Sequence, residues 1–541
     1  MSSKGSSMSV LTVGSSATRA LISLVFVFMV AQAAPVLAGF PVFKQAVAEY
    51  ASTDAALAEF YRERGYAPVW TGQGDAERRH ALLTALERAP VHGLPAARYA
   101  PHRLRETFAD IRTERDRGRV EVETSRLFLR YARDIQSGVL EPGQVDGGLA
   151  MKVPRRDRLE QITAFAAADP HIFLRELAPR NPHYVRLLKE KLRLERVLRQ
   201  GGWGPALGGG KLEPGDSGAD VVALRNRLVR MGYMNRSAAS GYDSTLQSAV
   251  QRFQTDHGLA SDGVAGPDTI GALNVPARER LKQVVVGLER ARWLNKPLGE
   301  RHILVNQAAF TAYVVDDGKV SFETRVVIGK RDRDLRTPEF SDEMEHLIVN
   351  PTWHVPRSIA TEEYLPQLKR NPNAAGHLRI YDVRGRVVDR SRVDFTRFNK
   401  RNFPFDMKEP PSRGNALGLV KFMFPNRFNI YLHDTPAKSL FGYDRRAFSH
   451  GCVRVQDPFD LAYTLLSRQT DNPEALFHRT LQTGRETQIN LERKVPVHLT
   501  YRTVWVDPKG QVNYRDDVYG RDARIFDALT AAGVALNDVQ S

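Results

Sequence analysis

A chain of 541 residues with a single cysteine forms no disulfide within itself, so packed apolar cores have to hold its roughly three domains together. The formal net charge of +16 suits an anionic partner, such as a cell-envelope polymer or a membrane surface. Nucleic acid is a poorer fit, because the basic residues are scattered among acidic ones and the chain begins with an export signal.

That signal occupies residues 1–38. Lys4 and Arg19 precede an apolar run from Ala20 to Ala34, and small or apolar residues lead to a cleavage point before Gly39. The run is shorter than the roughly 20 residues that a membrane span needs, although an uncleaved anchor is the alternative. We therefore expect an exported, periplasmic protein without a stable transmembrane anchor.

Residues 39–200 are expected to form a helical scaffold domain without chemistry of its own, and the glycine-rich residues 201–211 a linker. Residues 212–274 combine three short helices with glycine turns. They carry Gly232-Tyr233, Ala249-Val250-x-x-Phe253-Gln254, Gly258-Leu259, Asp262-Gly263 and Gly266-x-x-Thr269. This pattern resembles the type 1 peptidoglycan-binding domain, although Arg225 stands where that family usually has glutamine. A helical spacer without wall affinity is the alternative.

An amphipathic connecting helix is expected within residues 276–300, and β-strands from residue 301 onward. Strands are predicted at 303–305, 312–315, 324–328, 346–349, 421–424 and 429–432, with a hairpin turn at 316–319. Residues 357–412 are polar and arginine-rich, with one helix at 358–368, and form a candidate lid. The predicted fold class is multi-domain α+β: a helical scaffold, a three-helix module and a mostly β catalytic domain (301–490), followed by a C-terminal strand and tail (491–541).

The lone cysteine, Cys452, lies in Ser449-His450-Gly451-Cys452-Val453-Arg454, nineteen positions after His433. A thiol beside glycine and imidazole has what a nucleophile needs. We favour His433 as the base, because it sits at a strand end, while His450 either holds the turn or acts directly. Ser449 and the amides around Gly451 are candidate supporting or oxyanion groups. Arg454 either binds a substrate carboxylate or pins the loop.

Two other interpretations of this site are a buried, inert cysteine and a zinc site. His433, His450 and Cys452 offer three ligands for zinc, but no fourth ligand is evident and the short-range pairs of structural zinc sites are missing. We therefore expect no metal.

These residues form a pattern that resembles the signature of the YkuD-type L,D-transpeptidase catalytic domain. The pattern is His433-x-Thr435 followed by Ser449-His450-Gly451-Cys452-x-Arg454. Asp434 stands where that family often has glycine. Further matching stretches include 350–356, 415–418, 421–426 and 432–436, and the whole order resembles the large periplasmic multi-domain L,D-transpeptidases. Trp353, Asn415 and Tyr431 are the substrate-binding residues that we expect in and beside these stretches.

The resemblance implies a peptidoglycan L,D-transpeptidase that needs no cofactor. Cys452 would form a thioester with a stem peptide and pass it to a second stem as a 3→3 cross-link, with other wall-synthesis enzymes as further partners. Hydrolysis by an L,D-carboxypeptidase and transfer to another amine acceptor are the alternatives. A cysteine endopeptidase of the NlpC type is disfavoured, because its cysteine precedes its histidine. A non-catalytic wall-binding protein is disfavoured by the intact motif.

Overall fold

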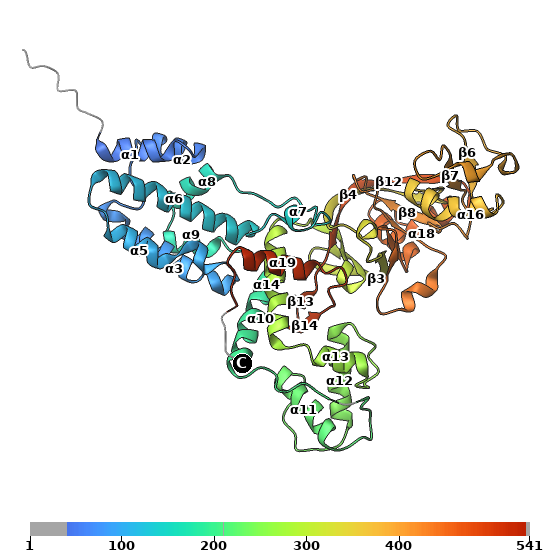
Figure 1. Ribbon diagram of the computed structural model, residues 1–541, viewed down its shortest axis with the longest axis horizontal. Helices are drawn as coiled ribbons and strands as arrows, with labels where there is room; N and C mark the ends of the chain where they lie inside the picture. The colour runs from blue at the N-terminus through green and yellow to red at the C-terminus, as the bar shows by residue number, and fades with distance from the viewer. Residues whose placement is uncertain (1–40, 209, 537–541) are drawn as a thin grey trace, which may run out of the picture.

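The computed structural model describes residues 41–208 and 210–536, and the predicted signal peptide lies outside these residues. Three lobes surround a central helix: a helical lobe, a three-helix module and a β domain that carries a small outer subdomain (Figure 1). Within the described ranges, none of the helices combines the length and the hydropathy needed to cross a bilayer.

The N-terminal lobe is entirely helical, as predicted. Its longest helix, α6, begins at a capping box in which Thr113 and Asp116 satisfy each other's backbone amides. Glu121 of α6 is buried and accepts hydrogen bonds from the amides of Val69 and Trp70, which fixes the loop after α2. The main helices are α1 (Val42–Ala51), α2 (Ala55–Glu63), α3 (Ala76–Glu87), α5 (Pro101–Ala109), α6 (Glu114–Ser137), α8 (Arg158–Ala167), α9 (Pro170–Glu176) and α10 (Pro182–Arg199).

The predicted three-helix module is also present. Its helices are α11 (Ala219–Met231), α12 (Ser244–His257) and α13 (Pro267–Leu273). The first two end at Gly232 and Gly258, whose φ angles of 88° and 68° lie in the left-handed region that glycine tolerates. Arg225 is buried and pairs with Asp243, so this departure from the family pattern has a structural role.

The helix α14 (Ala277–Trp293) is not the amphipathic connector that the sequence suggests. From Val284 to Trp293 every residue is buried. The reason is that α14 packs against α10 on one side and against the C-terminal helix α19 (Arg521–Ala531) on another. Its charged residues find partners inside the protein, as when Glu289 pairs with Arg292.

The β domain is built on a sheet that closes on itself. The strand order is β10-β3-β11-β9-β8-β4-β12-β1-β2, and β2 pairs back onto β3. The predicted hairpin turn at 316–319 connects β2 and β3. Strand β12 lies between β4 and β1 and spans residue 490, so a domain boundary at that residue would cut it. The strands are β1 (Arg301–Asn306), β2 (Thr311–Asp316), β3 (Lys319–Gly329), β4 (Phe340–Val349), β8 (Val420–Met423), β9 (Leu432–His433), β10 (Ala447–Ser449), β11 (Val453–Val455) and β12 (Thr487–Thr500).

Residues between β4 and β8 form the outer subdomain, here called the lid. It has its own apolar core and a small sheet in the order β5-β7-β6. The helix predicted at 358–368 is present but irregular, with a π-helical stretch between two short α-helices. Its elements are β5 (Trp353–His354), α15 (Arg357–Ile359), α16 (Leu365–Arg370), β6 (Arg379–Tyr381) and β7 (Asp406–Glu409).

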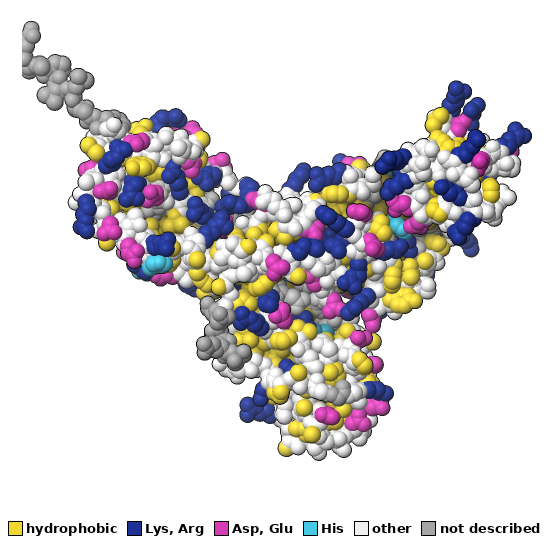
Figure 2. Space-filling model, viewed as in Figure 1, with side chains coloured by type: hydrophobic (Ala, Val, Ile, Leu, Met, Phe, Trp, Pro, Cys, Tyr) yellow, Lys and Arg dark blue, Asp and Glu magenta, His cyan; other side chains and the backbone are white. Residues whose placement is uncertain are grey.

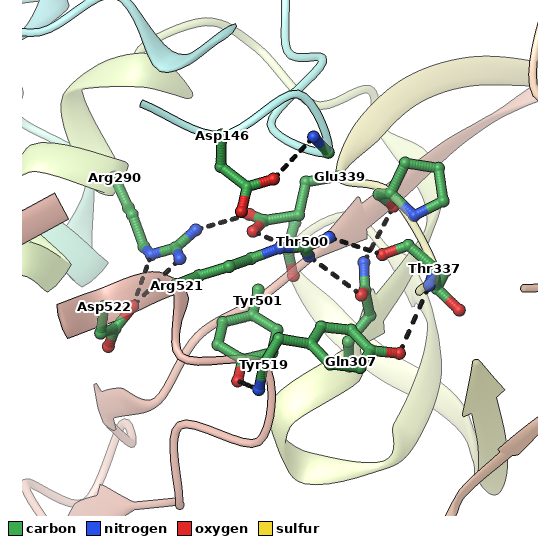
Figure 3. A network of polar contacts seen from close by, with 12 residues as sticks. Asp146, Arg290, Gln307, Thr337, Glu339, Thr500, Tyr501, Tyr519, Arg521 and Asp522 are labelled. Carbon is green, nitrogen blue, oxygen red and sulfur yellow. Dashed lines mark hydrogen bonds and ion pairs between the residues drawn. The ribbon is translucent and has the colours of Figure 1, made fainter. Parts of the chain in front are cut away.

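A buried network of charges joins the β domain to the helices α14 and α19 (Figure 3). Glu339, just before β4, pairs with Arg290 of α14 at 2.6 Å and with Arg521 of α19 at 3.2 Å. Asp522 pairs with the other side of Arg290 at 3.0 Å. All four side chains are buried, so each charge depends on its partners for stabilisation.

We predict that Glu339→Gln lowers the free energy of unfolding by about 3–5 kcal/mol, because it leaves the buried guanidinium of Arg521 without a carboxylate partner among the described residues and that of Arg290 with Asp522 alone. Denaturant unfolding of the full chain measures this. Glu345→Gln, which breaks an exposed pair between β4 and Lys494 of β12, is the control and should have a much smaller effect, because solvent screens an exposed ion pair. Equal effects of the two substitutions would contradict the prediction.

Candidate active site

The predicted nucleophile and base lie on neighbouring parallel strands of the closed sheet. Val453 lies opposite Leu432, and Arg454 opposite His433. Leu432 and Val453 point into the core of the sheet, and side chains alternate along a strand. His433 and Arg454 therefore share the other face with Cys452. At normal strand spacing and rise, the Cα atoms of Cys452 and His433 are about 8 Å apart.

His433 is buried and held in one tautomer. Its Nδ1 lies 2.5 Å from the backbone oxygen of Asp434, and because a carbonyl only accepts, Nδ1 carries the hydrogen. In the neutral ring this leaves Nε2 free to take a proton. The Asp434 carboxylate faces elsewhere and accepts from the amide of Leu419, as strand alternation predicts. Burial, assisted by the positive charge of Arg454, lowers the pKa of His433 to about 3, so the ring is neutral at physiological pH.

Cys452 is half-buried, and its Sγ lies 3.6 Å from the backbone oxygen of Asn429. Burial raises the pKa of the thiol to about 11, although hydrogen bonds from Tyr431 and the charges of Arg454 and Lys421 oppose this shift. A thiol and a neutral imidazole are therefore the resting forms. The site suits removal of the thiol proton by His433 during attack rather than a preformed thiolate.

Lys421 is a member of this site that the sequence did not single out. It lies on β8 directly opposite His433, and its Nζ is 5.8 Å from the centre of the Tyr431 ring. Burial lowers the pKa of Lys421. The only signal for this residue is its register, which becomes known once β8 and β9 are paired.

The turn that carries Cys452 is tied down by hydrogen bonds. Ser449 Oγ donates to the Cys452 carbonyl at 2.6 Å and accepts from the Gly451 amide at 3.1 Å. Gly451 has a φ of 119°, which strains other residues, and its carbonyl accepts from Thr337. The Gly451 amide is thus engaged within the turn, which makes it a poor oxyanion donor.

His450 points to the lid rather than to the sulfur. Its Nε2 lies 2.5 Å from a carboxylate oxygen of Glu363, so this histidine joins the turn to the lid. Of the two roles that the sequence left open for His450, this geometry favours a structural one.

The side chains of two expected substrate-binding residues are packed or hydrogen-bonded inside the lid. Trp353 is buried in the lid core and contacts the ring of Tyr364 edge-on. Asn415 is fully buried; its amide donates to the Glu409 and Pro410 carbonyls, and its oxygen accepts from a backbone amide. Both side chains are therefore engaged within the lid, and their part in substrate binding stays a prediction.

Tyr431 and Arg454 lie where a substrate could meet them. Tyr431 packs against the lid core, and its side chain forms a hydrogen bond to Cys452. Arg454 is half-buried, and its Nε is a buried donor without a partner among the described residues. The strand predicted at 429–432 is shorter than expected, because Asn429 adopts a positive φ of 54° and β9 begins only at Leu432.

No group of three His, Cys, Asp or Glu residues in the described part of the chain is arranged to hold a metal ion.

Comparisons with known proteins match three parts of the chain to known domain families. Residues 300–489 match the L,D-transpeptidase catalytic domain (YkuD), residues 217–273 a "Putative peptidoglycan binding domain", and residues 55–192 a "Scaffold domain". A "Putative L,D-transpeptidase" of Haemophilus influenzae is 34% identical over 225 residues, which are 41% of this chain and 45% of the relative. The chain thus spans about half the length of this curated relative.

Two solved structures are similar at a level that supports no argument. One is an L,D-transpeptidase from Xylanimonas cellulosilytica, with 18% identity, a TM-score of 0.17, and coverage of 55% of this chain and 99% of that one. The other is a fused Zn-dependent amidase/peptidase/peptidoglycan-binding domain-containing protein from Clostridium acetobutylicum. It has 13% identity, a TM-score of 0.15, and coverage of 53% and 98%.

The β domain with its cysteine turn thus coincides with the match to a catalytic domain family. More specifically, residues 300–489 match the L,D-transpeptidase catalytic domain of the YkuD type, and the same chain carries a match to a peptidoglycan-binding domain at 217–273.

The raised pKa of Cys452 predicts how the thiol reacts with iodoacetamide. Because only the thiolate reacts, the alkylation rate should rise about tenfold per pH unit between pH 7 and 10. Lys421→Met removes a positive charge that stabilises the thiolate, so the pKa should rise further and alkylation at pH 8 should slow. Lys494→Met, on an exposed part of β12, is the control. A rate that levels off below pH 8 would show a preformed thiolate and contradict this description.

Proposed function

We propose that this protein is a peptidoglycan L,D-transpeptidase that forms 3→3 cross-links through a thioester on Cys452. The observation that carries the proposal is the placement of Cys452 and His433 on one face of paired strands, in a YkuD-type domain beneath a lid. The peptidoglycan-binding domain supports the same substrate and a location outside the cytoplasm, as the predicted export signal does.

In the first half-reaction, His433 Nε2 takes the thiol proton as Sγ attacks the carbonyl of the donor stem's third residue. The tetrahedral intermediate collapses when His433 returns that proton to the departing amine of the terminal D-Ala. A thioester remains on Cys452. Tyr431, Lys421 and Arg454 favour the negative charge that passes through the sulfur, since each lowers the thiol pKa.

In the second half-reaction, the side-chain amine of another stem attacks the thioester. His433 takes a proton from this amine, the new amide forms, and the sulfur leaves and recovers its proton. Water competes with the amine for the same thioester, so exclusion of water by the lid favours transfer over hydrolysis.

The remaining domains fit a polymeric substrate. A wall-binding module raises the local concentration of stems that cannot diffuse to the enzyme. Its core is continuous with that of the helical lobe and with the C-terminal hairpin of β13 (Val504–Val506) and β14 (Val512–Tyr514). The module is therefore packed against the helical lobe and the C-terminal hairpin.

We predict that Cys452→Ala abolishes cross-linking while the protein unfolds at an unchanged denaturant concentration. His433→Asn should keep a reactive thiol but slow cross-linking by roughly 10²- to 10⁴-fold, because the general base is lost. Mass spectrometry of muropeptides after incubation with purified protein measures both. Normal product from Cys452→Ala would refute the proposal. Trimmed tripeptide stems without cross-links would indicate the carboxypeptidase alternative, and stems joined to another amine would indicate a different acceptor.

A further inference from the structure

A cleft of about 850 Å³ lies between the helical lobe and the β domain and ends at the cysteine turn. One wall is residues 143–148, at and after α7 (Pro142–Val145) of the helical lobe, and the other is the segment between β3 and β4. The walls are joined where the Ala150 amide donates to the Glu339 carbonyl at 2.8 Å and the Glu339 amide to the Gly148 carbonyl at 2.7 Å. In Figure 1, α7 lies in the concavity between the two lobes.

The inner end of the cleft is lined by residues that neighbour the reactive cysteine. His450 and Gly451, which immediately precede Cys452, line it, as do Phe428 and Ile430. Asn429 lies between Phe428 and Ile430, and its carbonyl oxygen contacts Cys452 Sγ. The cleft is therefore lined next to the thiol by two chain segments, 428–430 and 450–451.

The cleft is positively charged. Arg333 is exposed, lines the cleft and forms no ion pair among the described residues. Arg336 also lines it, and its guanidinium lies over the ring of Tyr519 without a carboxylate partner in the described part of the chain. Two further lining arginines, Arg521 and Arg524, are already paired with carboxylates. Among the described residues that line the cleft, Asp334 is the carboxylate without an ion-pair partner.

The concavity is basic at larger scale as well. Figure 2 shows Lys and Arg side chains gathered along it, between the helical lobe and the β domain. A carboxylate-bearing ligand is therefore attracted to this region and finds free guanidinium groups inside the cleft.

The direction of the reaction decides which part of a substrate lies here. The departing and the incoming amine both exchange a proton with His433, so both approach the acyl carbon from the side of His433. His433 lies beyond Cys452 along the strand direction, whereas the cleft lies before it, at residues 428–430 and 450–451. The acyl half of the donor must therefore extend away from His433, toward the cleft.

We infer that this cleft binds the acyl half of the donor stem through carboxylates upstream of the scissile bond, with Arg333 as a specificity-determining residue. This inference rests on the proposed function, which supplies the donor. It makes the helical lobe part of the substrate site, since residues 143–148 form one wall.

The test compares Arg333→Glu with Arg493→Glu, an exposed arginine on β12, in the full chain. Calorimetry on Cys452→Ala protein measures binding of a tetrapeptide stem and of an analogue whose upstream carboxylates are amidated. Arg333→Glu should weaken binding of the charged stem by about tenfold and change binding of the amidated stem less than twofold. Arg493→Glu should change neither. Arg333→Gln should give an intermediate loss for the charged stem.

Equal weakening of both stems, or no weakening of either, would overturn the inference. Iodoacetamide alkylation of Cys452 at an unchanged rate in Arg333→Glu verifies that the cysteine turn is intact. The rate of thioester formation, measured in proteins that keep Cys452, distinguishes failure of the cleft assignment from failure of the proposed function. If the thioester forms equally fast in Arg333→Glu, the cleft assignment is wrong. If no thioester forms but charge-dependent binding persists, the cleft assignment stands and the proposed function is wrong.

Discussion

One buried carboxylate, Glu339, links the cysteine turn to the helices that hold the lobes together. Arg290 of α14 and Arg521 of α19 both pair with it, and both guanidinium groups are buried. Arg521 also donates to the Thr337 carbonyl, and the Thr337 hydroxyl donates to the carbonyl of Gly451. The position of the nucleophile therefore depends on charge pairing at the junction between the β domain and the helical lobe.

The same balance between burial and charge sets the reactivity of the thiol. Burial alone disfavours a thiolate, while Lys421, Arg454 and the Tyr431 hydroxyl favour it. The result is a thiol that stays protonated at rest, and in the proposed function His433 activates it when a substrate is bound. Such a thiol is protected from reaction with solutes in the absence of substrate, even though the single cysteine is partly accessible.

Much of the fold was predictable because it depends on local patterns. The helical lobe, the glycine-capped helices of the module and the hairpin at 316–319 follow from capping residues, glycine turns and hydrophobic periodicity. The buried face of α14 was not predictable, because it depends on three lobes packing around one helix. At the site, the motif singled out Cys452 and His433. Lys421 required strand register, and the roles of Trp353, Asn415 and His450 required knowledge of how the lid folds back.

The most direct measurement is the intact mass of the protein after mixing with a tetrapeptide stem in the absence of an acceptor amine. A mass increase equal to the stem without its terminal D-Ala is expected. It should lie on the peptide that contains residue 452 and be released by hydroxylamine, as a thioester is. An unchanged mass while the stem is consumed, or an adduct on any other residue, would contradict covalent catalysis by this cysteine.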